Sequence, residues 1–357
     1  MFFRVASPRR PSRLLAAAVS LTTPLLPEDY VGLVNPLWST TALRGRVVEV
    51  RPETERATTL RIRPGRGWAG HRAGQYVRVG VDVDGVRHWR TYSLTSAERA
   101  DRDLSITVQA LDGGVVSPHL AHRTPVGTIV HLEAAEGDFV LPAPVAAPLL
   151  MITAGSGITP VMGMLRTLAE RGPLPDLALL HSAPNADDVI FRDELRALGA
   201  RVVLRHTGTE GRLDLAELDT LCPDWRDREA YVCGPAGLLD AAEAHWAEHP
   251  DRLHLERFTP PARSTGGTGG TVRYGSADGD AVEVAADASL LEAGEAAGVL
   301  LPSGCRMGIC FGCVLPLREG QVRDLRSGEV HGEPGDLIQT CISGASGAAR
   351  LDTPTTS

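Results

Sequence analysis

The sequence predicts a multi-domain fold: an antiparallel β-barrel, then a doubly wound α/β domain, then a small α/β domain built around cysteines. Short alternating segments broken by Gly, Pro and Asp fill residues 42–145, and longer apolar runs alternate with helical patterns in residues 146–260. A Gly/Ser/Thr-rich stretch at 261–270 has the composition of a flexible linker and precedes the four cysteines of residues 271–357. A chain of 357 residues has room for two or three domains.

Composition narrows the classes of function. The formal net charge of −8 argues against nucleic acid as a partner. All 36 basic residues are arginine, which excludes Schiff-base and lysine-nucleophile chemistry. The chain from Thr271 onward contains six arginines and twelve Asp and Glu residues, which is an excess of negative charge. This excess is either an ordinary solvated surface or an acidic face that docks a basic partner.

Residues 1–41 are expected to form a basic, helical N-terminal segment. Arg9, Arg10 and Arg13 precede the apolar run 14–19, as in a leader sequence, but this run is too short to span a bilayer. We expect an amphipathic helix that lies on the protein or on a membrane surface. The expected location is cytoplasmic, with peripheral membrane association or export as the alternatives.

The first domain is predicted from six segments in which apolar and polar residues alternate. Six such strands within about 100 residues indicate an antiparallel barrel. The pair Gly113-Gly114 marks a tight turn that leads into a short helix near Ser117. The predicted strands are Arg46–Val50, Thr58–Ile62, Gln75–Val79, Arg90–Leu94, Leu104–Val108 and Ile129–Leu132.

The second domain begins with a continuous apolar run, which is typical of a buried parallel strand. A Gly155-x-Gly157 turn follows it, with Thr159 predicted as the N-cap of a helix and Pro160 as its first residue. Alternation of strands and helices then predicts the doubly wound arrangement. The predicted strands are Leu149–Thr153, Leu177–Ser182, Val202–His206 and Ala230–Cys233.

The third domain carries the most specific motif. Cys305, Cys310 and Cys313 have the spacing C-x4-C-x2-C, and 27 residues separate Cys313 from Cys341. This is the spacing of a plant-type [2Fe–2S] loop. A zinc site usually has two C-x2-C pairs, and a set of disulfides requires a secreted protein. We therefore predict that these four cysteines bind an iron–sulfur cluster.

Elements around the cysteines complete a small α/β fold. Two short strands are predicted at Thr271–Tyr274 and Ala281–Ala285. A helix is predicted to start at the capping box formed by Ser289 and Glu292. The fourth cysteine, Cys341, is expected on a strand.

Three motifs in the first two domains fit nucleotide-like ligands. Arg90 at a strand end suits a phosphate, and Tyr92 suits stacking on a flat ring. The turn 114–117 opens a helix and would bind a pyrophosphate, as would the glycines of 155–157. Each signal is weak alone, because Arg and Tyr in strands are usually surface and packing residues. The motif 233–235, Cys-Gly-Pro, follows the last predicted strand.

Together these motifs resemble the ferredoxin–NADP reductase superfamily with a C-terminal ferredoxin fused to it, over roughly residues 42–352. The resemblance implies a flavin-binding barrel, an NAD(P)-binding α/β domain and a β-grasp ferredoxin domain with a [2Fe–2S] cluster. It is closest to reductases that supply oxygenases and fatty-acyl desaturases. Segment 34–39 is similar to actinobacterial reductases that serve membrane acyl-CoA desaturases.

The resemblance also implies roles for individual residues. Cys233 and Glu256 would act catalytically where nicotinamide and flavin meet, although a small buried hydrophobe is the alternative for Cys233. The remaining Cys222 is expected to be structural. The implied cofactor-binding residues are Arg90, Tyr92, Ser93, Thr107, Gly114, Val116 and Ser117 for the flavin, and Gly155, Gly157, Thr159, Pro160, Ser182, Arg192, Arg212, Gly234, Pro235 and Phe258 near the nucleotide and the flavin.

Cofactor identity follows from local chemistry. The pyrophosphate turn favours FAD over FMN. Arg192 and Arg212, with Ser182, are candidates for the 2′-phosphate of NADP, and no acidic residue directly ends the strand at Ser182. NADPH is therefore favoured over NADH.

The resulting hypothesis is an electron-transfer reductase that moves electrons from NADPH through FAD and the cluster to a partner oxygenase, hydroxylase or fatty-acyl desaturase. Two alternatives remain. One is a stand-alone NAD(P)H oxidase or a ferric or flavin reductase with small-molecule acceptors, and the other is a non-catalytic redox-sensing module. The linker would let the cluster domain move between flavin and partner, unless that domain is rigidly docked.

Overall fold

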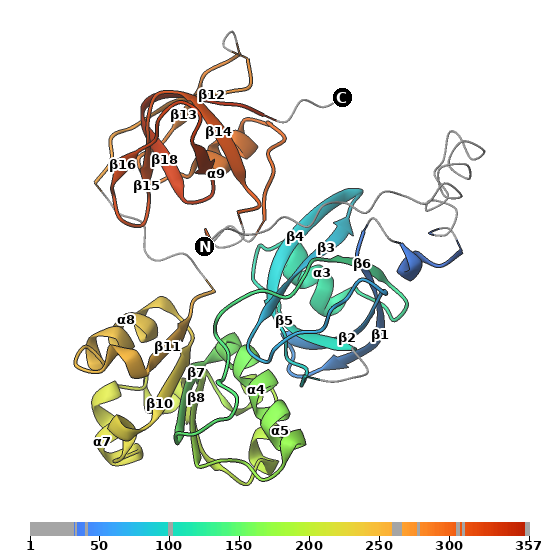
Figure 1. Cartoon of the computed structure of the whole chain (residues 1–357), viewed down its shortest axis with the longest axis vertical. Coiled ribbons are helices and arrows are strands. Elements are labelled where there is room, and N and C mark those ends of the chain that lie inside the picture. The colour runs from blue at the N-terminus through green and yellow to red at the C-terminus, as the bar shows by residue number, and fades with distance from the viewer. Residues whose placement is uncertain are drawn as a thin grey trace.

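A computed structural model describes residues 32, 34–39, 42–98, 103–258, 266–276, 279–304, 308 and 311–353. These residues form three sheets, one antiparallel, one parallel and one mixed (Figure 1). The predicted fold class is therefore confirmed. The predicted N-terminal helix falls outside the described residues. Among the described residues, no helix is long and apolar enough to cross a membrane.

The barrel is a six-stranded antiparallel sheet in the order β4-β3-β6-β1-β2-β5. A bridge between Leu94 and Ile106 joins the end of β4 to β5 and closes the sheet on itself. Alternate strand residues such as Val77, Val79 and Leu60 fill the core, and helix α3 adds Leu120 to it. The elements are β1 (Arg44–Pro52), β2 (Ala57–Pro64), β3 (Tyr76–Val83), β4 (Val86–Ser93), β5 (Leu104–Gln109), α3 (Val116–His122) and β6 (Ile129–Leu132), after a 3₁₀ turn at Pro36–Trp38.

The second domain is a parallel sheet in the order β11-β10-β7-β8-β9. Strand β11 was not predicted. The strands are β7 (Leu149–Ala154), β8 (Leu177–Ala183), β9 (Arg201–His206), β10 (Glu229–Cys233) and β11 (Leu253–Glu256), and the α-helices are α4 (Ile158–Arg171), α5 (Arg192–Ala197), α6 (Thr207–Glu210), α7 (Leu218–Leu221) and α8 (Ala236–His245). Short 3₁₀ turns lie at Gly155–Gly157, Ala186–Asp188, Leu215–Glu217, Trp225–Asp227 and Pro250–Arg252.

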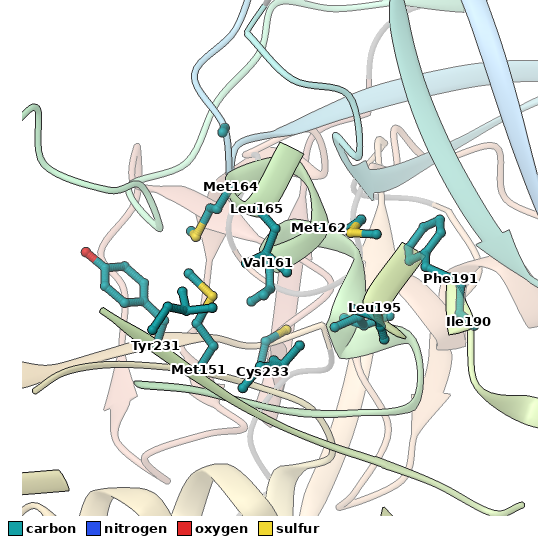
Figure 2. Packing of buried hydrophobic residues seen from close by; sticks show 14 of the residues in the cluster. Met151, Val161, Met162, Met164, Leu165, Ile190, Phe191, Leu195, Tyr231 and Cys233 are labelled. Atoms are coloured by element: carbon teal, nitrogen blue, oxygen red, sulfur yellow. The ribbon is translucent and has the colours of Figure 1, made fainter. Parts of the chain in front are cut away.

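Consecutive residues along each strand of this sheet point to opposite faces. Both faces are buried, which explains the continuous apolar runs. Met151 and Tyr231 pack against α4 and α5 on one face. Figure 2 shows Met162, Met164 and Leu165 of α4 above them. The adjacent Ile152 and Val232 pack with Trp225 and Trp246 on the other face. Both faces are thus covered, as a doubly wound domain requires.

Helix α4 begins earlier than predicted. Gly155–Gly157 forms a 3₁₀ turn that continues directly into the helix at Ile158, and no side chain caps its first turn. Thr159 is the second helical residue, and its hydroxyl donates to the carbonyl of Ser156 at 2.8 Å. The predicted N-cap at Thr159 and helix start at Pro160 are therefore wrong, because the 3₁₀ turn supplies the helical conformation before them.

The third domain is a mixed sheet with one helix. Strand β18 pairs parallel with β12 and antiparallel with β14 and β15. Strand β12 begins at Gly269, inside the stretch predicted as linker. Gly270 packs closely against β18, since a Cβ there would come within 2.0 Å of the Gly347 carbonyl oxygen. The elements are β12 (Gly269–Tyr274), β13 (Val282–Val284), α9 (Leu290–Ala296), β14 (Val314–Glu319), β15 (Val322–Asp324), β16 (Val330–His331), β17 (Leu337–Gln339) and β18 (Ser343–Leu351).

Two sequence expectations for this domain have different outcomes. The capping box is confirmed: Ser289 accepts from the N–H of Glu292 at 3.2 Å, and Glu292 accepts from the N–H of Ser289 at 3.0 Å. The strand expected at Cys341 is wrong, because Cys341 lies in the turn between β17 and β18. The N–H and hydroxyl of Thr340 both donate to the carbonyl of Cys313, which takes the chain out of the β17 ladder.

Helix α4 also joins the first two domains. A side chain at Gly163 would come within 2.5 Å of the Leu94 carbonyl oxygen, so the helix lies directly against the chain after β4. Arg166 donates to the Thr95 carbonyl at 2.6 Å and to Glu194 at 2.7 Å. Glu194 in turn accepts from Arg51 of β1 at 3.1 Å. The end of β4 is therefore fixed relative to α4.

A buried arginine ties together the amino-terminal edge of the parallel sheet. Arg228 precedes β10 and is only 5% exposed. Its guanidinium donates to Asp224 at 2.6 Å, lies 2.9 Å from Asp176, and donates to the Leu149 carbonyl at 3.1 Å. The hydrogen bond from Arg228 lowers the pKa of Asp224 from 3.8 to about 2.

Replacing this arginine by an apolar residue is expected to weaken the second domain. The variant Arg228→Met leaves two carboxylates and a carbonyl without their donor and should lower the free energy of unfolding by about 2 kcal/mol, since both carboxylates keep contact with water. Asp224 stabilises the folded state when ionised, so this difference should shrink as the pH falls from 3.8 towards 2.

Urea unfolding followed by tryptophan fluorescence measures this loss, because Trp225 and Trp246 lie in the same domain. Arg196→Met is the matched control, since Arg196 is 61% exposed and its ion pair with Asp193 is 4.0 Å long. Equal unfolding midpoints for the two variants would show that the Arg228 cluster adds no stability.

Candidate flavin, nucleotide and cluster sites

The end of β4 carries three residues predicted to bind the flavin. Arg90 and Tyr92 share one face of the strand, and Ser93 is its buried last residue. Tyr92 packs against the barrel core, and burial raises the pKa of its hydroxyl, which therefore stays protonated. Arg90 donates to the carbonyl of Trp89 at 2.8 Å, beside Tyr92. Arg90 and Tyr92 thus place a cation and a ring on one face of the strand, while the adjacent Ser93 points to the other face.

The predicted pyrophosphate turn has the form that its sequence indicates. Gly113 has φ +71°, and a Cβ there would meet no atom within 4 Å, so the turn faces open space. The Ser117 hydroxyl accepts from the N–H of Leu111 at 3.2 Å, and the N–H of Gly114 donates to the Leu111 carbonyl at 3.0 Å. The Val116 side chain is buried in the barrel core, so only its backbone is available to a ligand.

Thr107 lies apart from this turn. Its hydroxyl is buried and forms hydrogen bonds with the hydroxyls of Thr59 at 2.8 Å and Thr95 at 3.4 Å. Both of these hydrogen bonds lie inside the barrel. A role for Thr107 towards the flavin stays a prediction.

Close backbone packing unites the two turns predicted to bind the nucleotide. A Cβ at Gly157 would lie 2.1 Å from the carbonyl oxygen of Cys233, so only glycine fits there. The adjacent Gly155 has φ +54° and no atom within 4 Å of a Cβ position, which leaves its backbone open to a ligand. Gly234 packs against Ala154 at the end of β7. The structure therefore brings Gly155, Gly157 and the 233–235 turn to one edge of the sheet.

Two titratable groups meet beside this edge. Cys233 and Glu256 are register partners on β10 and β11. Burial, with a smaller contribution from the charge of Glu256, raises the pKa of Cys233, so its sulfur is a neutral thiol. Burial first, and then the charge of Asp138, raises the pKa of Glu256 from 4.5 to about 7. Phe258 packs against the same buried cluster as Cys233.

The residues proposed for a 2′-phosphate lie in or after the carboxyl-terminal ends of the parallel strands. Ser182 is buried near the end of β8, and Arg192 opens α5. Arg192 donates to Asp187 at 3.0 Å and to the Ala186 carbonyl at 3.3 Å. Arg212 is exposed in the loop after α6.

Sequence reasoning missed Arg205 and His181 in this region. Arg205 is the register partner of Ser182 on β9, and both line a cavity of about 90 Å³. Its guanidinium already binds Glu217 at 2.7 Å. His181 lines the same cavity, shares a 2.8 Å hydrogen bond with Thr153, and burial lowers its pKa to about 4. A polar residue inside an otherwise apolar strand was the available signal for both.

The structure brings together the two predicted cluster ligands that it describes. Cys313 and Cys341 are buried in one small cluster with Leu291 and Ile342. Gly308 has φ +77°, and its carbonyl accepts from the Gln339 side chain at 3.0 Å, which holds the loop against β17. Cys305 and Cys310 fall outside the described residues. Two thiols in a common buried site, reached by a tightly turning loop, fit the chemistry of an iron–sulfur cluster.

Comparison with known proteins agrees with this geometry. An oxidoreductase FAD-binding domain family matches residues 55–141, an oxidoreductase NAD-binding domain family matches 151–244, and a 2Fe-2S iron-sulfur cluster binding domain family matches 276–345. An "NADPH oxidoreductase" of Mycobacterium tuberculosis is 51% identical over 346 residues, which cover 94% of this chain and 90% of that protein.

The chain belongs to the ferredoxin–NADP reductase-like family of FAD- and NAD-binding reductases that carry a C-terminal 2Fe-2S ferredoxin domain.

Two further proteins are similar to much of this chain. The ferredoxin reductase component of a 3-ketosteroid-9-alpha-monooxygenase of M. tuberculosis is 32% identical, over 65% of this chain and 70% of that protein. The solved structure of phthalate dioxygenase reductase superposes with a TM-score of 0.63 at 25% identity, over 87% of this chain and 97% of that one. As a member of this reductase family, the protein uses FAD, a [2Fe–2S] cluster and NAD(P)H.

The raised pKa of Glu256 predicts a specific pH dependence of stability. A carboxyl group with a raised folded-state pKa contributes stability that is present below its unfolded value of 4.5 and is lost as the pH rises through about 7. Glu256→Gln cannot ionise and should therefore be about 1–2 kcal/mol more stable than the wild type well above pH 7. Below pH 4.5 the two proteins should be equally stable.

Thermal unfolding across this pH range measures the difference. Asp138→Asn removes only the smaller cause of the raised pKa, so the loss of stability with rising pH should move to a slightly lower pH. Glu256→Gln should have the larger effect and remove this loss, since burial is the larger cause. The exposed Glu55→Gln serves as the control. A pH dependence of stability that Glu256→Gln leaves intact would mean that another group titrates near pH 7.

Proposed function

We propose that this reductase takes electrons from NADPH and delivers them, through FAD and the cluster, to a partner oxygenase, hydroxylase or fatty-acyl desaturase. Its activity as an NAD(P)H oxidoreductase with FAD and a [2Fe–2S] cluster follows from the family. FAD accepts the two electrons of a hydride, and the cluster passes electrons on singly. One observation carries the proposal. A single chain contains β4 with the predicted flavin residues, the turn 155–157 predicted to bind the nucleotide, and the cysteines predicted to bind the cluster.

Within that scheme we assign each part of the chain one task. The open turn at Gly155 would bind the nucleotide pyrophosphate, and Cys233 would lie against the nicotinamide as a neutral thiol. Arg90 and Tyr92 would fix the phosphate and ring of the flavin. Glu256, with a pKa of about 7, would hold or release a proton beside them. Cys305, Cys310, Cys313 and Cys341 would bind the cluster.

NADPH is the proposed donor because a cation, Arg192, lies after β8 and no acidic residue directly ends that strand at Ser182. Arg192 lies beside the 3₁₀ turn that follows β8, where its partner Asp187 is 94% exposed and readily displaced by a phosphate. The relative that is 51% identical is an NADPH oxidoreductase. Both observations support NADPH over NADH.

A protein partner is proposed from the third domain and from the relatives. The stretch that begins at β16 exposes Glu333, Asp336 and Leu337, an acidic and apolar surface that would suit a basic partner. Relatives of 26–28% identity are reductase subunits of stachydrine N-demethylase and of glycine betaine monooxygenase. These names favour an oxygenase, whereas the resemblance at 34–39 favours a desaturase.

Removing a cluster ligand tests the exit route for electrons. In Cys310→Ser the reduction of cytochrome c by NADPH should be abolished, while flavin reduction by NADPH survives, because the substitution leaves the first two domains intact. Cys222→Ser is the control, since Cys222 is a buried cysteine outside the motif. Stopped-flow absorbance measures the flavin step, and the same enzyme is then reconstituted with a candidate oxygenase or acyl-CoA desaturase. Full turnover by Cys310→Ser would instead support the small-molecule oxidase.

The donor preference is tested by comparing NADPH with NADH. Flavin reduction should be faster with NADPH, and Arg192→Gln should raise the KM for NADPH about tenfold with little change for NADH, as expected for one lost charged hydrogen bond. Arg196→Gln, exposed on the same helix, is the control. Faster reduction by NADH in the wild type would refute the preference.

A further inference from the structure

The cluster loop meets the barrel at Arg78. This residue lies on β3, and its side chain is only 11% exposed. A Cβ at Gly312, the residue between Phe311 and Cys313, would lie 3.0 Å from Nη2 of Arg78 and 3.2 Å from its Cζ. The guanidinium therefore lies directly against the backbone of the cluster loop. In Figure 1 the third domain is on the side of the barrel that carries β3 and β4.

Two barrel residues hold the guanidinium in place. Nη1 of Arg78 donates to the carboxylate of Glu133 at 2.7 Å. Its Cζ lies 5.3 Å from the centre of the Trp89 ring, within the range of a cation–π contact. Trp89 is itself fixed flat across the backbone of Gly80, where a Cβ would lie 3.0 Å from three indole atoms. Both of these contacts to the arginine come from the barrel.

The contact lies beside the strand that carries the proposed flavin residues. Arg78 is the register partner of Thr91, which stands between Arg90 and Tyr92 on β4. Arg78 and Thr91 therefore share the face of this hairpin that is opposite to Arg90 and Tyr92, and the hairpin itself lies between the cluster loop and the flavin residues. The loop residue that touches Arg78 is adjacent to Cys313, a predicted cluster ligand.

We propose that Arg78 is the positioning residue that docks the cluster loop on the barrel beside the flavin strand. Four thiolates give the cluster site a negative character, which favours a nearby cation. Arginine suits the position because its planar group pairs with a carboxylate and stacks on an indole at the same time. Arg78 takes part in no bond change and carries no electron. It raises the fraction of molecules in which the loop lies against the barrel.

The test separates electron transfer into the cluster from the earlier flavin step. In the loaded enzyme, Arg78→Gln should leave the rate of flavin reduction by NADPH unchanged and slow cluster reduction about tenfold, as expected for the loss of one charged contact. Arg78→Lys keeps the charge but loses the planar guanidinium that stacks on Trp89. Its rate of cluster reduction should therefore lie between those of the wild type and Arg78→Gln. Arg87→Gln is the matched control, because Arg87 is 45% exposed and pairs with Asp82 at the far end of the same hairpin.

A second readout follows docking without turnover. Small-angle X-ray scattering of the oxidised holoenzyme should give a larger radius of gyration for Arg78→Gln than for the wild type and Arg87→Gln.

Added salt should slow cluster reduction in the wild type and have little effect on Arg78→Gln. Glu133→Gln loosens the arginine without removing it, so it should show the same changes to a smaller extent. This second variant tests the proposal if Arg78→Gln fails to retain its flavin.

Two results would overturn the proposal. One is that Arg78→Gln reduces its cluster at the wild-type rate and has an unchanged radius of gyration. If that variant loses its flavin, the same result in Glu133→Gln would overturn the proposal. The other is slowing of the flavin step to the same degree as the cluster step, which would show that Arg78 acts on the barrel rather than on docking.

Discussion

The arrangement of the sites depends on one close backbone contact, between Gly157 and the carbonyl of Cys233. With 2.1 Å available to a Cβ, no side chain fits, so the turn after β7 lies against the end of β10. The contact places the open backbone of Gly155 next to the 233–235 turn, and the register of β10 with β11 adds Glu256. A larger residue at Gly157 would separate these groups by forcing the helix away from the sheet.

The same helix carries this order into the barrel. Helix α4 starts at the nucleotide turn, and its middle, at Gly163 and Arg166, contacts the chain that leaves β4. Strand β4, which carries the residues predicted to bind the flavin, and the turn predicted to bind the nucleotide are therefore connected through one rigid element. Among the residues that the structure describes, the third domain has no comparable packed helix at this junction. Its cluster loop touches the barrel at Arg78, so the first two sites are fixed relative to each other while the third can be docked.

Local patterns predicted those parts of the fold that local chemistry determines. Alternation gave the barrel strands, apolar runs gave most of the parallel strands, and the Ser289 capping box gave the start of α9. Strand β11 was missed because it has four residues, two of which, His254 and Glu256, are polar. The turn at Cys341 was missed because it depends on Thr340 binding the distant Cys313 carbonyl. Arg78 looked like any outward-facing residue of an alternating strand, and only the docked loop distinguishes it.

Burial also explains why the groups at the edge of the parallel sheet carry so little charge. The apolar packing that raises the pKa of Cys233 and Glu256 lowers that of His181, so each is held towards its neutral form. Fixed positive charges are carried by Arg90 and Arg192. A donor ring that enters beside the buried residues would be surrounded by groups held towards their neutral forms. The hydrophobic core that stabilises the second domain therefore also determines the electrostatics of the site, and a substitution that admits water beside Met151 or Tyr231 would change both together.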